Sequence, residues 1–313
     1  MGLTRIKEDN ATSQGENPLK RQHIDSGVKV IFLLIALFSI TALSLIMVFL
    51  FKEGLPILDT VSIKAFVLGK YWYPTDDPAD FGILPLIMGS VSVTLLSGLM
   101  AIPLGIMTAI YLAEIAPPRV AELVKPVVEL MASMPSVVIG FFGMVVVAPF
   151  IQNLFHIPVG LNMFNASLML AFMAVPTICT ISEDAIFSVP TALKEASFAL
   201  GATHFETIFK VILPASLSGI CTAVILGLSR AVGETMVVLM AAGGAAMMPG
   251  SIFDPVRPLP ASIAAEMAEA PFGGEHYHAL FAIGIVLFIF TFAFNLMADF
   301  ISHRFRQVGE ASL

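Results

Sequence analysis

Charged residues are scarce in this sequence. Asp, Glu, Lys and Arg make up 12% of its 313 residues, whereas hydrophobic residues make up 57%. Soluble globular domains carry about 25% charged residues, so this composition excludes an ordinary soluble protein and indicates a polytopic membrane protein. The net charge of −7 identifies no partner, because membrane insertion follows the placement of Lys and Arg rather than the net charge.

Cysteine and the short motifs of catalysis are also scarce. Cys179 and Cys221 lie in apolar runs, where a thiol packs as a small hydrophobic side chain, so neither indicates a redox compartment. The sequence lacks the G-x-x-x-x-G-K-S/T loop of ATPases, and it lacks G-x-S-x-G and H-E-x-x-H. His276 and His278 are two residues apart and do not share a helix face. We therefore expect no enzyme, no metal site and no cofactor in this chain.

Long apolar runs dominate the sequence instead. A membrane helix needs about 20 apolar residues, and six runs reach or approach that length: 28–51, 83–112, 127–150, 165–183, 213–243 and 278–300. They predict an all-α fold with six transmembrane helices. The first run is longer than the core of a signal peptide and lacks an A-x-A cleavage site, so we expect it to be retained.

Lys and Arg divide unequally between the two sides of the predicted bundle. With the N-terminus inside, eleven of them fall on the cytoplasmic side and four on the outer side. The positive-inside rule then predicts that both termini are cytoplasmic. The predicted organisation is a mobile cytoplasmic tail (1–27), the first transmembrane helix with an outer loop (28–82), a core membrane domain (83–305) and a second cytoplasmic tail (306–313).

The segment 188–214, SVPTALKEASFALGATHFETIFKVILP, lies between the fourth and fifth runs. Pro190 favours a helix start, and Gly201 fits the left-handed residue that ends a helix. Thr203 and Glu206 have the spacing of a capping box, which begins a second helix. We predict a helix, a Gly turn and a helix, which together form a short elbow on the cytoplasmic side. On periodicity alone, an amphipathic connector at the membrane surface fits equally well.

This elbow resembles the EAA loop of ABC importer permeases, which reads E-A-A, three residues, Gly, nine residues, then I-x-L-P. The matching residues are Glu195, Ala196, Gly201, Leu213 and Pro214. Ser197 replaces the second alanine of E-A-A, and Val211 replaces the isoleucine. The resemblance implies the type I permease fold of ABC importers. It also implies that these residues, with Ser197, form a coupling helix that sits in a groove of a cytoplasmic ATPase.

Further motifs narrow the resemblance to the PstC-type permeases of phosphate-specific ABC importers. They are YLAEIAPP, ELMASMPSVVIGFFG, GLSRAVGETMVV and ASIAAEMAEA. The resemblance implies a PstA-type permease, a PstB-type ATPase dimer that uses ATP and Mg, and a periplasmic PstS-type phosphate-binding protein as partners. It implies a location in the bilayer of the bacterial cytoplasmic membrane and gives no reason to expect a nucleic acid partner.

Arg230 and Glu234 interrupt the fifth apolar run. A charge at the bilayer centre costs about 2.5–3.5 kcal/mol on insertion scales, so such residues face a partner or a wet cavity. Because they are four residues apart, we predict that they share one face of one helix.

The pair of charges can have one of two roles. Either they neutralise each other, or Arg230 donates paired hydrogen bonds to phosphate. Glu234 would then accept a hydrogen bond from a P–OH group, or hold Arg230 until phosphate arrives. The predicted substrate pathway comprises Arg230, Glu234, Thr235 and Ser136.

The leading hypothesis is a permease subunit that forms half of a phosphate pathway and converts closure of an ATPase into alternating access. The nearest alternative is a permease for another oxyanion, such as sulfate or molybdate. A proton-coupled secondary carrier, in which Glu234 carries the proton, is a further alternative, and the resemblance of the elbow to an EAA loop argues against it.

Overall fold

The computed structural model describes residues 18–310. Contacts divide the chain into two units, of which the first ends at Lys52 and the second begins at Glu53. Helix α1 (Pro18–Gly54) supplies the described part of the first unit. The second unit holds α2 (Ile57–Thr60), α3 (Ile63–Leu68), β1 (Trp72–Tyr73), β2 (Asp80–Phe81), α4 (Leu84–Ile110), η1 (Tyr111–Ile115), α5 (Pro118–Ser133), α6 (Ser136–Phe142), η2 (Gly143–Val147), α7 (Ala148–Phe155), α8 (Met163–Phe187), α9 (Thr191–Ala199), α10 (His204–Thr207), η3 (Ile208–Ile212), α11 (Leu213–Val232), α12 (Met236–Ala241), α13 (Leu259–Glu266) and α14 (Glu275–Glu310), where η marks a π-helical segment.

Six helical stretches are long and apolar enough to cross a membrane. They are Val28–Thr60, Leu84–Ile115, Ser136–Phe155, Met163–Phe187, His204–Val232 and Glu275–Met297. The prediction of an all-α fold with six spans is therefore confirmed. Within residues 18–310 the sheet is confined to the short antiparallel pair β1 and β2, in which Trp72 lies opposite Phe81. The cytoplasmic placement of the two termini stays a prediction.

Two of the apolar runs are broken into separate helices. In the run 127–150, α5 ends at Ser133, Met134 and Pro135 are extended, and α6 begins at Ser136. Proline explains this break, because it lacks an N–H group and disfavours a helical conformation in the residue before it. In the run 213–243, α11 ends at Val232 and α12 begins only at Met236. The prediction that Arg230 and Glu234 lie within one helix of the run 213–243 was therefore wrong.

Close packing of α4, α8 and α11 depends on glycine. Ile178 of α8 is fully buried between Gly105 of α4 and Gly227 of α11. A Cβ atom at Gly105 would lie 2.7 Å from Ile178 Cγ2, and one at Gly227 would lie 2.5 Å from Ile178 Cγ1. Small residues allow such close approach between membrane helices, whose association the hydrophobic effect does not drive. These three helices pack closely together in the second unit.

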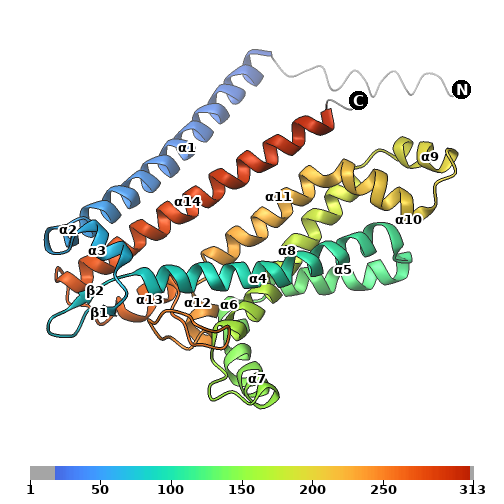
Figure 1. Cartoon of the computed structure of the whole chain (residues 1–313). Coiled ribbons are helices and arrows are strands. Elements are labelled where there is room, and N and C mark those ends of the chain that lie inside the picture. The colour runs from blue at the N-terminus through green and yellow to red at the C-terminus, as the bar shows by residue number, and fades with distance from the viewer. Residues whose placement is uncertain (1–17, 311–313) are drawn as a thin grey trace, which may run out of the picture. The chain divides into compact units, whose positions relative to one another are not determined.

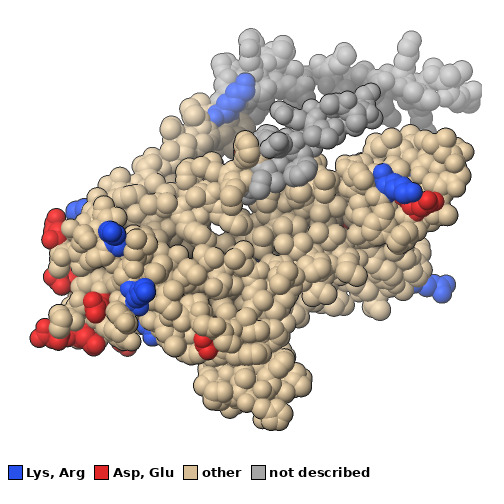
Figure 2. All heavy atoms as spheres, in the orientation of Figure 1, with Lys and Arg blue, Asp and Glu red and all other residues tan. Residues whose placement is uncertain are grey.

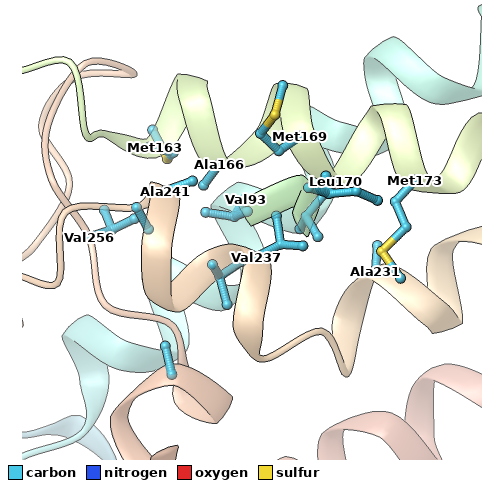
Figure 3. Packing of buried hydrophobic residues seen from close by; sticks show 14 residues of the cluster. Val93, Met163, Ala166, Met169, Leu170, Met173, Ala231, Val237, Ala241 and Val256 are labelled. Atoms are coloured by element: carbon cyan, nitrogen blue, oxygen red, sulfur yellow. The ribbon is translucent and has the colours of Figure 1, made fainter. Parts of the chain in front are cut away.

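A neighbouring buried cluster surrounds the short helix α12 (Figure 3). Val237 of α12 lies beside Val93 of α4 and Leu170 of α8, while Ala241 of α12 lies beside Ala166 of α8. All five of these residues are at most 2% exposed. Helix α12 is therefore packed into the centre of the unit although it is only six residues long.

The second unit carries different structures at its two ends. Figure 1 shows α9 and α10 at one end, and α2, α3, the β1–β2 pair and α13 at the other. On the face seen in Figure 2, charged side chains gather mainly toward the ends, and the surface between them is mostly uncharged. This is the distribution of a protein whose middle lies in lipid.

The contact of Gly105 with Ile178 predicts that Gly105→Ala destabilises the protein. Overpacking of an interior site typically costs about 1–3 kcal/mol. Gly233→Ala is a matched control, because a Cβ atom there would have no heavy atom within 4 Å. Thermal unfolding of the purified protein in mild detergent should give a lower midpoint for Gly105→Ala than for Gly233→Ala. Equal midpoints would contradict this account of the packing.

Candidate functional site

The structure brings the two broken spans together. Helices α6 and α12, which each begin directly after a break, pack against each other. A Cβ atom at Gly140 of α6 would lie 3.1 Å from the carbonyl oxygen of Met236 and 3.2 Å from Val237 Cα. Ser136, the first residue of α6, and Thr235, the residue before α12, are both half-buried. Two of the predicted pathway residues thus stand at the beginnings of two adjacent short helices.

Glu234 caps the beginning of α12. Its Oε1 atom accepts hydrogen bonds from the backbone N–H groups of Met236, at 3.2 Å, and Val237, at 3.4 Å. The first N–H groups of a helix have no partner within the helix, and a carboxylate there also interacts favourably with the helix dipole. The Glu234 carboxylate is therefore stabilised by the end of α12, and it retains Oε2 as a second acceptor atom.

Arg230 lies in the last turn of α11, on the other side of the break. A cation is favourable there, because the final carbonyl groups of a helix carry partial negative charge. The Arg230 side chain is exposed, and among the described residues it forms no ion pair with Glu234. The prediction that the two charges share one face of one helix was wrong. Each charge is instead placed at a different helix end, of the polarity that suits it.

The elbow between α8 and α11 has the predicted construction. Helix α9 ends at Ala199, Gly201 adopts the left-handed conformation with φ of 82°, and Thr203 forms a capping box with Glu206 at the start of α10. These three local predictions are confirmed. Of the predicted coupling residues, Ser197 is buried and Leu213 half-buried, whereas the exposed ones are Glu195, Ala196, Gly201 and Pro214.

A buried hydrogen bond closes the elbow. The hydroxyl oxygens of Ser197 in α9 and Thr207 in α10 lie 2.9 Å apart. Because the Thr207 hydroxyl donates to the carbonyl oxygen of Thr203 at 3.0 Å, the Ser197 hydroxyl donates to Thr207. An alanine at position 197, as in the E-A-A pattern, would lack this bond. The serine therefore ties the two short helices to each other across the Gly201 turn.

Two ion pairs, which the sequence did not predict, join α9 to η1 and α5 to α8. Lys194 of α9 lies 2.5 Å from a carboxylate oxygen of Glu114 in η1, and His204 contacts the Glu114 carbonyl oxygen at 3.2 Å. Lys125 of α5 lies 2.7 Å from Glu183 of α8. The hydrogen bond to the buried Glu183 carboxylate raises the pKa of Lys125. Glu114 belongs to the motif YLAEIAPP, but nothing in a single sequence pairs it with a residue 80 positions away.

The elbow also exposes apolar side chains. Leu200 is 90% exposed and Phe205 is 68% exposed. Leu200 lines a hollow of about 530 Å³ together with residues of α9, the Gly201 turn and Lys210. Exposed apolar groups of this kind are typical of a surface that binds another protein.

Comparisons with known proteins agree with this architecture. Residues 101–307 match the family described as "Binding-protein-dependent transport system inner membrane component". The chain is 40% identical over 271 residues to the probable ABC transporter permease protein YqgH of Bacillus subtilis (strain 168), covering 86% of this chain and 88% of that protein. It is 34% identical over 259 residues to the phosphate transport system permease protein PstC of Mesorhizobium japonicum, covering 77% of this chain and 78% of that protein.

The fold is shared with a solved ABC transporter. A chain in the crystal structure of a bacterial alginate ABC transporter in complex with an alginate pentasaccharide-bound periplasmic protein aligns with a TM-score of 0.60 at 16% identity. The alignment covers 89% of this chain and 96% of that one. With six membrane-spanning helices and the family match, the chain is a multi-pass protein of the bacterial inner membrane. It belongs to the family of binding-protein-dependent transport system inner membrane components, the permease subunits of ABC importers.

Proposed function

We propose that this chain is the PstC-type permease subunit of an ATP-driven importer of inorganic phosphate, in which it forms half of the transmembrane pathway. The observation that carries the proposal is the exposed guanidinium of Arg230 beside the break between α11 and α12. An exposed charge within a membrane span requires a wet cavity or a ligand. The similarity to PstC of Mesorhizobium japonicum supports phosphate as that ligand.

The chemistry of the break suits a protonated oxyanion. A guanidinium donates two parallel hydrogen bonds to phosphate oxygens and keeps its charge at any physiological pH. Phosphate near neutral pH also retains at least one P–OH group, which can donate to a carboxylate. While Oε1 of Glu234 caps α12, Oε2 is the atom that would accept this hydrogen bond. Fully ionised sulfate has no hydrogen to donate, so the Glu234 carboxylate would only repel it.

The elbow is the proposed site of coupling to ATP. We infer that a PstB-type ATPase dimer, which binds ATP and Mg, receives the exposed apolar face of α9 and α10. The elbow continues without interruption from α10 through η3 into α11, whose far end carries Arg230. A displacement of the elbow would therefore be transmitted along one rod to the proposed substrate site. A PstA-type permease would supply the other half of the pathway, and a PstS-type protein would deliver phosphate from the periplasm.

Uptake by the reconstituted importer tests the function. Proteoliposomes that contain this chain with its three partners should accumulate labelled phosphate when ATP is supplied, and a large excess of sulfate should not compete. Uptake that sulfate or molybdate abolishes would assign the chain to another oxyanion. Uptake that persists when the ATPase is disabled would revive a proton-coupled carrier.

Arg230→Lys tests the proposed contact with phosphate. We expect uptake to fall roughly tenfold or more, because a charge-assisted hydrogen bond is worth about 1.5–3 kcal/mol and an ammonium cannot reproduce the paired geometry. Arg119→Lys is the matched control, since Arg119 is also exposed but lies at the start of α5. Both variants should insert normally. Equal uptake by the two variants at matched abundance would exclude a paired contact of Arg230 with phosphate.

Glu234→Gln separates the roles of that carboxylate. The amide has a single acceptor oxygen, which can cap α12 or accept from the P–OH group but cannot do both at once, because its NH2 group only donates. The fold should survive, since the amide oxygen can take the place of Oε1 in the cap. If Glu234 accepts a hydrogen bond from phosphate, this variant should keep part of the uptake, whereas an electrostatic latch on Arg230 should fail. The double variant Arg230→Leu with Glu234→Gln should insert and lose phosphate uptake. Near-normal uptake by the double variant would refute the proposed substrate site.

Gly201→Val should disrupt the coupling between the elbow and the proposed ATPase. The left-handed conformation costs an ordinary residue about 1–2 kcal/mol and is worse for a β-branched one. A Cβ atom at position 201 would meet no other heavy atom within 4 Å, so strain in the backbone is the main local cost. Gly201→Asn is the control, because asparagine tolerates this conformation. ATPase activity and uptake should fall in the valine variant and remain in the asparagine variant. An equal loss of uptake in both variants would indicate that the new side chain blocks the proposed ATPase surface, and not that it strains the turn.

A further inference from the structure

Glu266 is the centre of a polar cluster at the end of the unit opposite the elbow. Its carboxylate accepts hydrogen bonds from the indole N–H of Trp72, at 3.0 Å, and from the Arg257 guanidinium. Nε2 of His276 lies 2.9 Å from its second oxygen. These three partners come from β1, from the loop before α13 and from the first turn of α14. One carboxylate thus joins three segments to α13.

The position of Glu266 is electrostatically unfavourable for its own helix. It is the last residue of α13, where the helix dipole favours a cation rather than an anion. Its side chain is only 14% exposed, so water provides little compensation. Trp72, at 2% exposure, and His276, at 11%, are similarly shielded. The carboxylate is therefore retained for the bonds that it makes to other segments and not for the stability of α13.

Arg257 extends this cluster to the end of α12. Its Nε donates to the carbonyl oxygen of Gly244 at 2.6 Å. Gly243 and Gly244 follow Ala242, the C-cap of α12, and both have positive φ, 88° and 68°. The preceding Val256 donates its N–H to the carbonyl oxygen of Ala242 at 2.9 Å. The loop at the end of α12 is therefore held by Arg257, which is itself held by Glu266.

We propose that Glu266 is a positioning residue for anion transport, which fixes the end of α12 remote from Glu234. Helix α12 has two ends, one capped by Glu234 and the other tied to Arg257. If the second end is released, α12 and the Glu234 carboxylate with it lose their fixed position beside α11. The effect on transport rests on the proposed function. The mechanical part, in which Glu266 holds the far end of α12 through Arg257, does not rest on it.

Two measurements on Glu266→Gln test the mechanical part. Trp72 is the only tryptophan of the chain, so its indole N–H resonance reports the hydrogen bond to Glu266 directly. That resonance should move upfield in the variant. Backbone amides of residues 236–244 should exchange with solvent deuterium roughly tenfold faster, because a weaker link allows local opening. Glu269→Gln is the matched control, since Glu269 is exposed and lies three residues further along, in the turn that follows α13. It should change neither quantity.

Uptake measurements test the transport part. In proteoliposomes, Glu266→Gln should lower the maximal rate of phosphate uptake several-fold and leave the half-saturating phosphate concentration and the unfolding midpoint unchanged. A purely structural residue would lower the midpoint or the abundance instead. Unchanged amide exchange at 236–244 would overturn the inference, and so would faster exchange with an unchanged maximal rate.

Arg257→Gln keeps the inference testable if Glu266→Gln fails to fold. It leaves the bond from Trp72 to Glu266 in place and removes the link to Gly244. Amides 236–244 should then exchange faster while the indole resonance stays constant, and unchanged exchange would again refute the inference. If the wild-type importer takes up no phosphate, the proposed function fails, yet the exchange and indole measurements still decide whether Glu266 holds α12.

Discussion

The break between α11 and α12 is the constraint on which the rest of the structure depends. A broken helix within a membrane leaves N–H and carbonyl groups that lipid cannot satisfy. The Glu234 carboxylate accepts hydrogen bonds from two free N–H groups at the start of α12, and Arg230 lies at the carbonyl end of α11. The two charges are thus accommodated by opposite helix ends rather than by each other. This leaves the guanidinium open to a ligand, which an internal ion pair would not.

The remaining elements hold this break in place from several sides. Helix α6 supports α12 through the close approach at Gly140, and α4 and α8 bury its apolar face. Arg257 and Glu266 hold its far end. From the other direction, the elbow leads directly into α11, so one continuous helical rod joins the proposed ATPase surface to Arg230. Proposed energy input and proposed substrate contact lie at the two ends of the same helix.

Local features of the fold were predictable from the sequence, and contacts between distant segments were not. The six spans followed from apolar length, and the elbow followed from Gly201 and the capping box of Thr203 and Glu206, because each signal lies within a few residues. The break at Gly233 was missed, since its flanks are apolar and a membrane helix tolerates glycine. The bonds of Ser197 to Thr207 and of Glu266 to Trp72 depend on tertiary packing. No spacing in one sequence reveals an indole bonded to a carboxylate 194 residues away.

Solvent access to the break tests the central claim most directly. The measurement uses Thr235→Cys in the reconstituted importer, with Cys179 and Cys221 replaced and Arg230 and Glu234 intact. The rate at which a membrane-impermeant thiol reagent modifies this cysteine is followed during ATP turnover. If the break lines a phosphate pathway, the cysteine reacts and phosphate slows the reaction, whereas sulfate does not. A cysteine that never reacts, or one that reacts at the same rate with and without phosphate, would contradict the account.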